Sequence, residues 1–160
     1  MTLAETIRMK YPQAVAQVSD LSGQPLIVAN REAIRGFCDA LKKDPNFQFD
    51  LLMDLFGVDF LHWEEKAIRF EVVYQLYSSV KHHRLFIKVP VPEKGAAVDS
   101  VAGVWPAANW YERETWDMFG ISFNGHPDLK RILMYEEFKG HALRKDYPYN
   151  KRQPLVGPMN

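Results

Sequence analysis

The segment IRFEVVYQLYS, residues 68–78, gives the clearest indication of the fold that this sequence encodes. Two sets of side chains alternate along it, one apolar and one mixed: Phe70, Val72, Tyr74 and Leu76, then Glu71, Val73, Gln75 and Tyr77. A period of two residues is typical of a β-strand, because successive side chains point to opposite faces of a sheet. An apolar face opposite a mixed face predicts a half-buried strand of an antiparallel sheet.

Further strand-like segments lie on both sides of this one. VDFLHW (58–63) and HRLFIKVPV (83–91) are rich in branched and aromatic residues, which favours two more strands. Nearer the N-terminus, AVAQVSD (14–20) and PLIVAN (25–30) flank the turn LSGQ (21–24), which predicts another strand pair.

Helical patterns lie between and after these strands. Residues 3–10 are expected to form a short helix that ends near Tyr11-Pro12. Asn30 is a candidate cap for a second helix. That helix has one apolar stripe at helical spacing, formed by Ile34, Phe37, Cys38 and Leu41.

Two more helices are expected further along the chain. Residues 50–55 can form a short helix, with an Asp as its cap and a Gly two residues behind it. Another helix begins near a proline and spans about 106–119, and Gly120 is expected to stop it. The segment 92–100 is expected to be a loop, residues 100–105 fit either a short helix or a strand, and the chain is expected to be irregular after Gly120.

The order of these elements predicts an α+β fold: a single domain with a mainly antiparallel sheet and helices packed on it. A chain of 160 residues can bury such a core without disulfides or metal. We expect the domain to span residues 1–140, and residues 141–160 to form an extended, proline-rich tail that docks on a partner. The charges around this tail are mainly basic: Lys139, Arg144, Lys145, Lys151 and Arg152, with Asp146 as the acid.

The composition argues against several classes of function. Twenty basic residues balance twenty acidic ones, so no global field draws the chain to nucleic acid or to anionic lipid. No apolar stretch approaches the roughly 18 residues of a membrane-spanning helix, and the charged N-terminus does not resemble a signal peptide. Cys38 is the only cysteine, and we expect it to be a core residue in a reducing compartment.

The stretch WYERETWDMFGISFNGHPDLKRIL, residues 110–133, is dense in charged and aromatic side chains. A paired-acid site is disfavoured here, because Glu112 and Glu114 are two residues apart and point to opposite sides of a helix. Arg113 and Asp117 are four residues apart and can pair on its surface. The sequence contains no motif typical of a metal site, a phosphate loop or an activated nucleophile.

Helical spacing predicts which of these groups are buried. One side combines an apolar stripe with two acids: Ala107, Trp110, Tyr111, Glu114, Asp117 and Met118. Glu114 lies in the middle of this stripe and needs a basic partner, for which Arg131 and Arg144 are the candidates. Trp116 lies on the other side beside Arg113, a combination typical of a protein interface, so we expect it to contact a partner.

The histidines are expected to have structural roles. His126 lies in the turn-like GHPDL, where a hydrogen-bonded turn residue is a better interpretation than a base or a metal ligand. His82 and His83 are adjacent in a predicted strand, so they point to opposite faces and cannot chelate one metal. A free-standing enzyme that uses Glu112 or Glu114 with His126 is the rival hypothesis, and the helix geometry disfavours it.

A series of motifs carries a resemblance to a known family: ERE (112–114), DMFGI (117–121), FNGHPDLKRIL (123–133), LRKDYP (143–148) and GVD (57–59). Together these motifs resemble the 30-kilodalton subunit family of respiratory complex I, to which the C subunit of NADH–quinone oxidoreductase belongs. The resemblance covers roughly residues 12–150. It departs from the family pattern at Trp116, where Tyr or Phe is usual, and at Lys130, where Arg is common.

The resemblance implies a non-catalytic assembly subunit of proton-pumping NADH–quinone oxidoreductase, with no cofactor of its own. Members of the family lie in the hydrophilic arm, beside the quinone-site or D subunit and the iron–sulfur subunits. FMN, the iron–sulfur clusters and quinone are bound by those partners. The resemblance also implies a peripheral location at the cytoplasmic face of the bacterial inner membrane. Because the sequence stops soon after LRKDYP, the fused quinone-site domain of some relatives is expected to be absent.

We expect a charged, hydrogen-bonded seam that fixes the helix–loop geometry and contacts a partner, with Glu114 and Arg131 as an internal pair. No catalytic or metal-binding residue is predicted. An equivalent subunit of a membrane-bound hydrogenase or of a ferredoxin- or deazaflavin-linked quinone oxidoreductase stays an alternative, as does an adaptor without a respiratory role. The predicted interface and signature residues are Trp110, Glu112, Arg113, Glu114, Trp116, Asp117, Phe119, Gly120, His126, Pro127, Asp128, Arg131, Arg144, Lys145 and Asp146.

Overall fold

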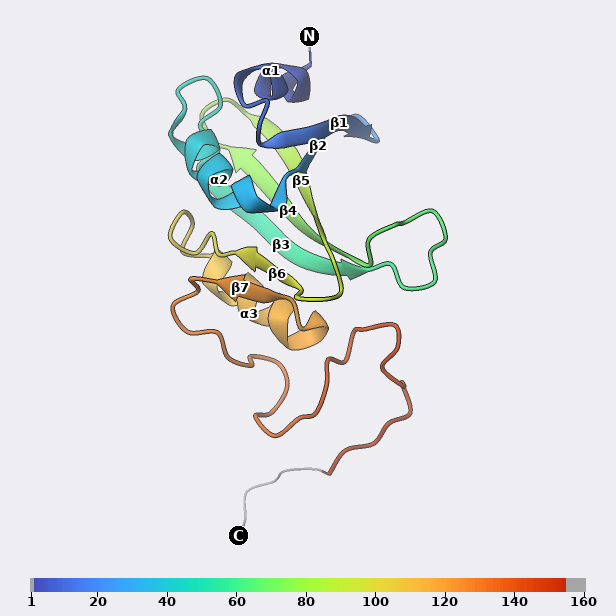
Figure 1. Cartoon of the computed structure of the whole chain (residues 1–160). Helices are drawn as coiled ribbons and strands as arrows, with labels where there is room; N and C mark the ends of the chain where they lie inside the picture. The colour runs from blue at the N-terminus through green and yellow to red at the C-terminus, as the bar shows by residue number, and fades with distance from the viewer. Residues whose placement is uncertain (1, 155–160) are drawn as a thin grey trace.

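A computed structural model, which describes residues 2–154, contains a five-stranded sheet with helices packed against it (Figure 1). The strands follow the spatial order β1-β2-β5-β4-β3. Strands β2 and β5 are parallel, and the other neighbouring pairs are antiparallel. The predicted α+β class, with a mainly antiparallel sheet, is therefore confirmed. The strands are β1 (Val15–Leu21), β2 (Gln24–Ala29), β3 (Leu51–Asp59), β4 (Phe70–Ser78) and β5 (His83–Val91).

The β1–β2 hairpin forms around the predicted turn. Ser22 and Gly23 have φ angles of 51° and 85°, so both adopt the left-handed conformation that tight two-residue hairpin turns require. The N–H of Gly23 donates to Oδ1 of Asp20 over 2.6 Å. Leu21 pairs with Gln24 across the turn, which confirms the prediction for LSGQ.

Strand β4 lies between β3 and β5 and shows the predicted alternation. It is antiparallel to both neighbours. On its mixed face, Gln75 and Tyr77 are half-buried, whereas Glu71 and Val73 are buried, so this face is more covered than the sequence predicts. The apolar set of the strand is fully buried: Phe70, Val72, Tyr74 and Leu76.

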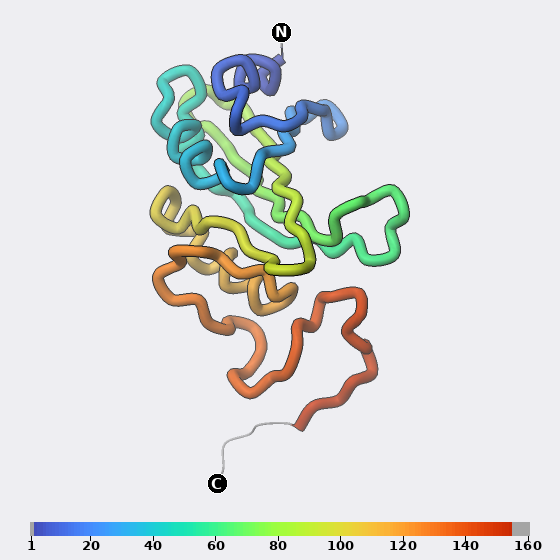
Figure 2. Tube along the Cα trace, viewed as in Figure 1, coloured from blue at the N-terminus to red at the C-terminus, as the bar shows by residue number. Residues whose placement is uncertain are grey.

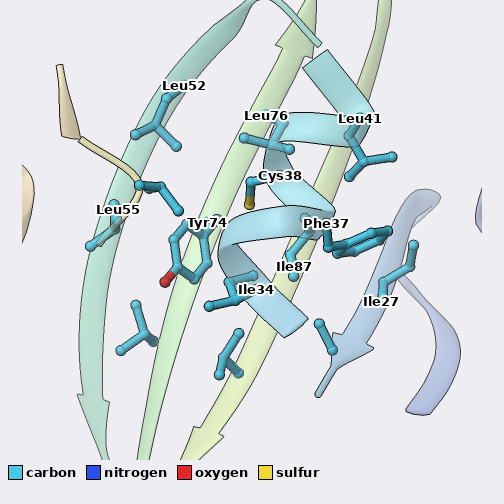
Figure 3. Packing of buried hydrophobic residues seen from close by; sticks show 14 of the residues in the cluster. Ile27, Ile34, Phe37, Cys38, Leu41, Leu52, Leu55, Tyr74, Leu76 and Ile87 are labelled. Carbon is cyan, nitrogen blue, oxygen red and sulfur yellow. The ribbon is translucent and has the colours of Figure 1, made fainter. Parts of the chain in front are cut away.

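The N-terminal helices form as predicted. Helix α1 (Leu3–Lys10) begins with a capping box between Thr2 and Glu5. The short 3-10 helix η1 (Arg31–Ala33) leads into α2 (Ile34–Lys43). Figure 3 shows α2 packed beside residues of β4 and β5, with Cys38 in the core. The predicted stripe of α2 is buried in full: Ile34, Phe37, Cys38 and Leu41.

Three predictions for residues 30–63 are wrong. Residues 51–55 belong to β3 and not to a helix, because β4 pairs with this segment, with one irregularity between Leu52 and Asp54. Asp50 accepts the N–H and the hydroxyl of Ser79 instead of capping a helix. Asn30 donates from its amide to the carbonyl oxygen of Gln13 and does not cap η1 with its side chain. Of the strand predicted over 58–63, only residues 58–59 are in a strand, as the end of β3. Residues 60–63 are irregular.

A smaller unit follows β5. Strands β6 (Ala97–Asp99) and β7 (Ser122–Asn124) form a parallel pair, and helix α3 (Ala108–Phe119) lies between them in the sequence. Helix α3 and its stop at Gly120 confirm the prediction, whereas the two short strands lie in segments predicted to be irregular. Residues 102–104 form a turn and residues 100, 101 and 105 are irregular, so neither alternative predicted for 100–105 is correct. Figure 2 shows the chain continuing after β7 without regular structure to residue 154.

None of the helices found between residues 2 and 154 is long and apolar enough to cross a membrane.

Candidate functional site around helix α3

Helix α3 lies against strand β3 at a position that requires glycine. A Cβ atom at Gly57 would lie 2.8 Å from Cδ2 of Phe119 and 3.1 Å from Cγ2 of Thr115. Because such approaches are too close for a Cβ atom, the glycine lets the helix sit directly on the strand. The buried side chains of α3 are Ala108, Glu112, Thr115, Asp117 and Met118.

The buried face of α3 differs from the predicted one. Glu114 is exposed and Trp110 is 68% exposed, although the sequence predicts both to face inward. Trp116, predicted to face a partner, packs on the domain's own core and lies edge-on against His141. The predicted pair between Glu114 and Arg131 is therefore wrong, because the loop after the helix selects a different carboxylate.

Asp117 is that carboxylate, and it is fully buried. Its Oδ2 accepts three consecutive backbone N–H groups, from Ile132 at 3.1 Å and from Leu133 and Met134 at 2.9 Å. Its Oδ1 lies 2.5 Å from Nη1 of Arg131. Burial alone raises the pKa of Asp117, but the N–H donors and the guanidinium outweigh burial and hold its pKa below the ordinary value.

Arg131 links Asp117 to the segment that contains residues 138–140. Its Nη2 donates to the carbonyl oxygens of Phe138 and Gly140, at 2.6 and 3.1 Å. Its guanidinium carbon also lies 5.8 Å from the centre of the Trp116 ring, within the range of a cation–π contact. One arginine thus joins the helix, the loop that contains it and the segment that follows.

Arg113 fixes the same loop from the helix side. It donates to the carbonyl oxygens of Lys130 and Arg131, at 3.1 and 2.9 Å, and does not form the pair that its spacing from Asp117 allows. Asp128 forms an exposed pair with Lys130 at 2.7 Å. Pro127 is exposed beside it, so the tip of this loop faces solvent.

Glu112 is the second fully buried carboxylate of α3, and it holds the segment before the helix. Its Oε2 accepts the hydroxyl of Ser100 at 2.6 Å, and its Oε1 accepts the N–H of Val101 at 2.7 Å. Burial raises the pKa of Glu112 to about 7, although the two hydrogen bonds oppose this rise. Glu112 can therefore change its charge near neutral pH.

His126 is a hydrogen-bonded turn residue, as predicted. Its Nε2 lies 3.0 Å from the carbonyl oxygen of Asn109, and its Nδ1 accepts the N–H of Asp128 at 3.0 Å. These partners select the neutral ring with its proton on Nε2, because a carbonyl needs a donor and an N–H needs an acceptor. Oε2 of Glu112 lies 3.9 Å from Nε2 of His126. Because the ring in this tautomer is neutral, the contact is not an ion pair.

The end of α3 is capped by residues further along the chain. The last carbonyl groups of a helix have no partner inside it and must be bound from outside. Residues 141–144 supply three of the four donors here, and none of them was predicted for this role. The donor–acceptor pairs are Gly120 N–H to Trp116 O (2.8 Å), His141 Nδ1 to Asp117 O (3.0 Å), Leu143 N–H to Met118 O (3.0 Å) and Arg144 Nε to Phe119 O (2.5 Å).

Gly120 makes this cap possible. Its φ of 73° lies in the left-handed region, where glycine is favoured. A Cβ atom there would lie 2.5 Å from Nε2 of His141 and 2.6 Å from Nη2 of Arg144. The close packing also lowers the pKa of His141, chiefly because burial disfavours its charged form.

A third buried carboxylate, Asp59 at the end of β3, holds the next part of the chain. Arg69 contacts both of its oxygens, at 3.1 and 2.9 Å, and also reaches Asp146 at 2.8 Å and the carboxylate of Glu93. Oδ2 of Asp59 accepts the N–H of Lys145 at 2.8 Å. Residues 144–146, predicted to belong to a docking tail, are therefore bound to the chain's own domain.

Four members of this site were not predicted from the sequence: Asp59, Arg69, Ser100 and His141. The GVD motif is the signal that could have led to Asp59, because Asp59 lies in it and contacts Lys145 of the LRKDYP motif. In the part of the chain that the structure describes, no group of three or more His, Cys, Asp or Glu side chains is placed to hold a metal.

Three buried carboxylates thus bind three irregular segments of the same chain: Glu112 holds residues 100–101, Asp117 holds 131–134, and Asp59 holds 145. These contacts define a small α+β domain whose signature charges fix its own backbone. Comparison with known proteins gives this domain a family. Residues 27–153 match the family described as "Respiratory-chain NADH dehydrogenase, 30 Kd subunit". The chain belongs to this complex I 30-kilodalton subunit family, the family of the NADH-quinone oxidoreductase C subunit.

Individual relatives match this chain along nearly its whole length. The chain is 42% identical over 156 residues to the NADH-quinone oxidoreductase C subunit of Geobacter metallireducens, covering 96% of this chain and 94% of that protein. It is 44% identical over 147 residues to the corresponding C subunit of Roseiflexus sp., covering 92% of this chain and 83% of that protein. The predicted family resemblance is confirmed.

Two solved structures have a similar fold. One is a trypsin-resistant fragment of Nqo5, with a TM-score of 0.70 and 32% identity; the match covers 81% of this chain and 100% of that one. The other is a chain of a membrane-bound sulfane sulfur reductase, an archaeal respiratory membrane complex. That match has a TM-score of 0.68 and covers 84% of this chain and 76% of the other, but at 23% identity it shows a common fold alone.

Proposed function

We propose that the chain is a non-catalytic assembly subunit in the peripheral arm of proton-pumping NADH–quinone oxidoreductase. In this role it holds the quinone-site subunit and the neighbouring iron–sulfur subunits together. The relatives named as C subunits of NADH-quinone oxidoreductase support the complex, and the hydrogen bonds within the signature segment support a non-catalytic role.

The observation that supports a non-catalytic role is how the ionisable groups of the signature are used. Both oxygens of Glu112 and both ring nitrogens of His126 have hydrogen-bond partners inside the domain. Asp117 is surrounded by four donors. Glu112 and Glu114 do not face each other, since one is buried and the other exposed. A general acid or base must reach a substrate proton, and these groups are occupied with backbone and side-chain partners of their own domain.

Under this proposal the redox chemistry belongs to the partner subunits, which bind FMN, iron–sulfur clusters and quinone. The chain itself would bind no cofactor, and it would lie at the cytoplasmic face of the inner membrane, held there through the complex. The predicted interface residues that are exposed are the ones available for this role, chiefly Trp110, Glu114, Pro127 and Asp128.

An affinity pull-down of tagged chain from solubilised membranes, with mass spectrometry of the captured proteins, tests the proposal. Recovery of the quinone-site, iron–sulfur and NADH-oxidising subunits together is the expected result. Recovery of a hydrogenase large subunit, or of ferredoxin- or deazaflavin-linked subunits, would keep the assembly role and replace the complex. A tagged chain that captures no respiratory subunit would contradict the proposal and support an adaptor of another kind.

A further inference from the structure

A groove lies beside the edge strand β3, between residues 60–65 and residues 143–145. Its volume is about 870 Å³, and Gly57 and Phe119 lie along it. A smaller hollow of about 210 Å³ between β3 and α3 shares Gly57, Phe119 and Leu143 with it, so the two hollows are adjacent. Figure 1 shows that β3 is the last strand of the sheet and that the β3–β4 connection projects from its end.

The apolar groups of this groove are incompletely covered. Trp63 is 58% exposed and Leu143 is 54% exposed, and both line the groove. Large apolar side chains that gather in a depression are typical of a surface that another molecule covers.

The charged groups of the groove have one predominant sign. Glu64 and Glu65 line its wider part, and Glu114 lines the smaller hollow. Among residues 2–154, none of these three carboxylates forms an ion pair. Lys145 is the one lysine or arginine among the residues that line the two parts, and His62 also lines the wider part. The whole chain has balanced charge, so the acidic character is local to the groove.

We infer that this groove binds an extended, basic segment of a partner subunit, with one large apolar side chain between Trp63 and Leu143. Lysine or arginine residues of the segment would face Glu64, Glu65 and Glu114, because opposite charges across an interface favour association and orientation. An extended segment suits the site, since the groove follows an edge strand whose outer backbone groups have no strand partner in the described chain. The inference rests on the proposed assembly role and adds the chemistry of one partner surface.

Photo-crosslinking tests this inference in the assembled complex. A photoreactive phenylalanine analogue is placed at Leu143 of the tagged full-length chain, and membranes are irradiated before solubilisation. The expected crosslinks join position 143 to one segment of a partner subunit that contains lysine or arginine. The same analogue at Met9, which is 69% exposed on α1 at the other end of the domain, is not expected to capture that segment.

Neutralising the acids gives a second readout. The triple variant Glu64→Gln, Glu65→Gln and Glu114→Gln changes three exposed side chains, so it is expected to fold normally and to bind the crosslinked partner roughly fivefold more weakly. The weakening is expected to shrink as salt concentration rises. A matched variant with Glu32→Gln, Glu136→Gln and Glu137→Gln removes three acids outside the groove and is expected to bind normally.

The outcomes separate this inference from the proposed function. Intact complex I subunits in the pull-down, with no crosslink at position 143 or with crosslinks only to a second copy of the chain, would overturn the groove inference alone. A crosslinked segment without basic residues, or equal binding by the two triple variants, would overturn it as well. A pull-down without respiratory subunits would overturn the proposed function first.

Discussion

Asp117 and Arg131 form an ion pair across 14 residues of sequence, with Oδ1 and Nη1 2.5 Å apart. The carboxylate is fully buried, and the same side chain accepts the N–H groups of Ile132, Leu133 and Met134. A single carboxylate therefore fixes an irregular loop onto helix α3.

Asp117→Asn is expected to destabilise the fold strongly. Asparagine has one acceptor oxygen and one NH2 donor, so it cannot accept from both the arginine and the three N–H groups. The change also leaves the Arg131 guanidinium without its buried counter-charge. Breaking a buried pair by removing one partner costs about 3–5 kcal/mol. Urea unfolding of the isolated chain measures the loss. Asp128→Asn is the matched control, because its pair with Lys130 is exposed to solvent and is expected to contribute little to stability.

Low pH is expected to weaken the contacts of Asp117 with residues 131–134. The folded-state pKa of Asp117 lies below its ordinary value of 3.8, so the ionised form stabilises the fold above that pH. This stability is lost as the pH falls through the folded-state pKa. The wild-type chain should therefore lose more stability than the Asn variant when the pH is lowered from about 5 to about 2. Parallel losses in the two proteins would contradict this assignment.

Glu112→Gln is expected to alter the pH dependence of folding stability, because wild-type Glu112, unlike Asp117, favours the folded state at low pH. Burial raises the folded-state pKa of Glu112 to about 7, above its ordinary value of 4.5. Between these pH values the folded chain keeps a proton that the unfolded chain loses, so stability falls as the pH rises to about 7. Because glutamine does not titrate, the variant should gain about 2–3 kcal/mol relative to wild type between about pH 5 and pH 8.

Urea unfolding across that pH range measures the difference. Glu114→Gln serves as the control, since Glu114 is exposed and its replacement should leave the slope unchanged. If wild type and Glu112→Gln showed the same slope, Glu112 would not be a protonated buried acid in the folded chain.

Gly120→Ala is expected to damage the cap of α3. The left-handed backbone costs a residue with a Cβ about 1–2 kcal/mol, and the methyl group would also displace His141 and Arg144. Thermal unfolding should show a lower midpoint. Gly36→Ala is the matched control: Gly36 lies inside α2 with open space around it, so the same change should stabilise the chain by about 0.5–1 kcal/mol. Equal effects at the two sites would argue against the cap.

Arg69→Gln is expected to release residues 144–146 from the domain. The change leaves the buried carboxylate of Asp59 without its counter-charge and removes a partner of Asp146. Limited digestion with trypsin should then cut after Arg144 or Lys145 faster than in wild type. Arg84→Gln, an exposed change on β5, should not alter the rate. An unchanged cleavage pattern in the first variant would show that Arg69 does not hold this segment.

Local sequence patterns predicted the elements that bury a regular face. The alternation around Tyr74 and the stripe through Cys38 both describe packing that each segment has by itself. Residues 50–55 were ambiguous for the same reason: a short apolar run between Asp and Gly fits a helix or a strand, and pairing with β4 decides the outcome.

The site depends on contacts between distant residues, which local spacing does not contain. Glu114 and Asp117 lie on neighbouring positions of one helix, and only the loop at 131–134 determines which is buried. The cap from residues 141–144 and the contact between Asp59 and Lys145 span still longer separations. The family motifs marked several of these residues, and the structure supplies their partners.

Membrane activity in a strain that lacks the chain tests the central proposal most directly. NADH–quinone reductase activity should be lost from these membranes and restored by a plasmid-borne wild-type copy. The Asp117→Asn chain should restore less activity than the Asp128→Asn chain, in proportion to the amount of assembled complex. Full NADH–quinone reductase activity in membranes without the chain would contradict the account.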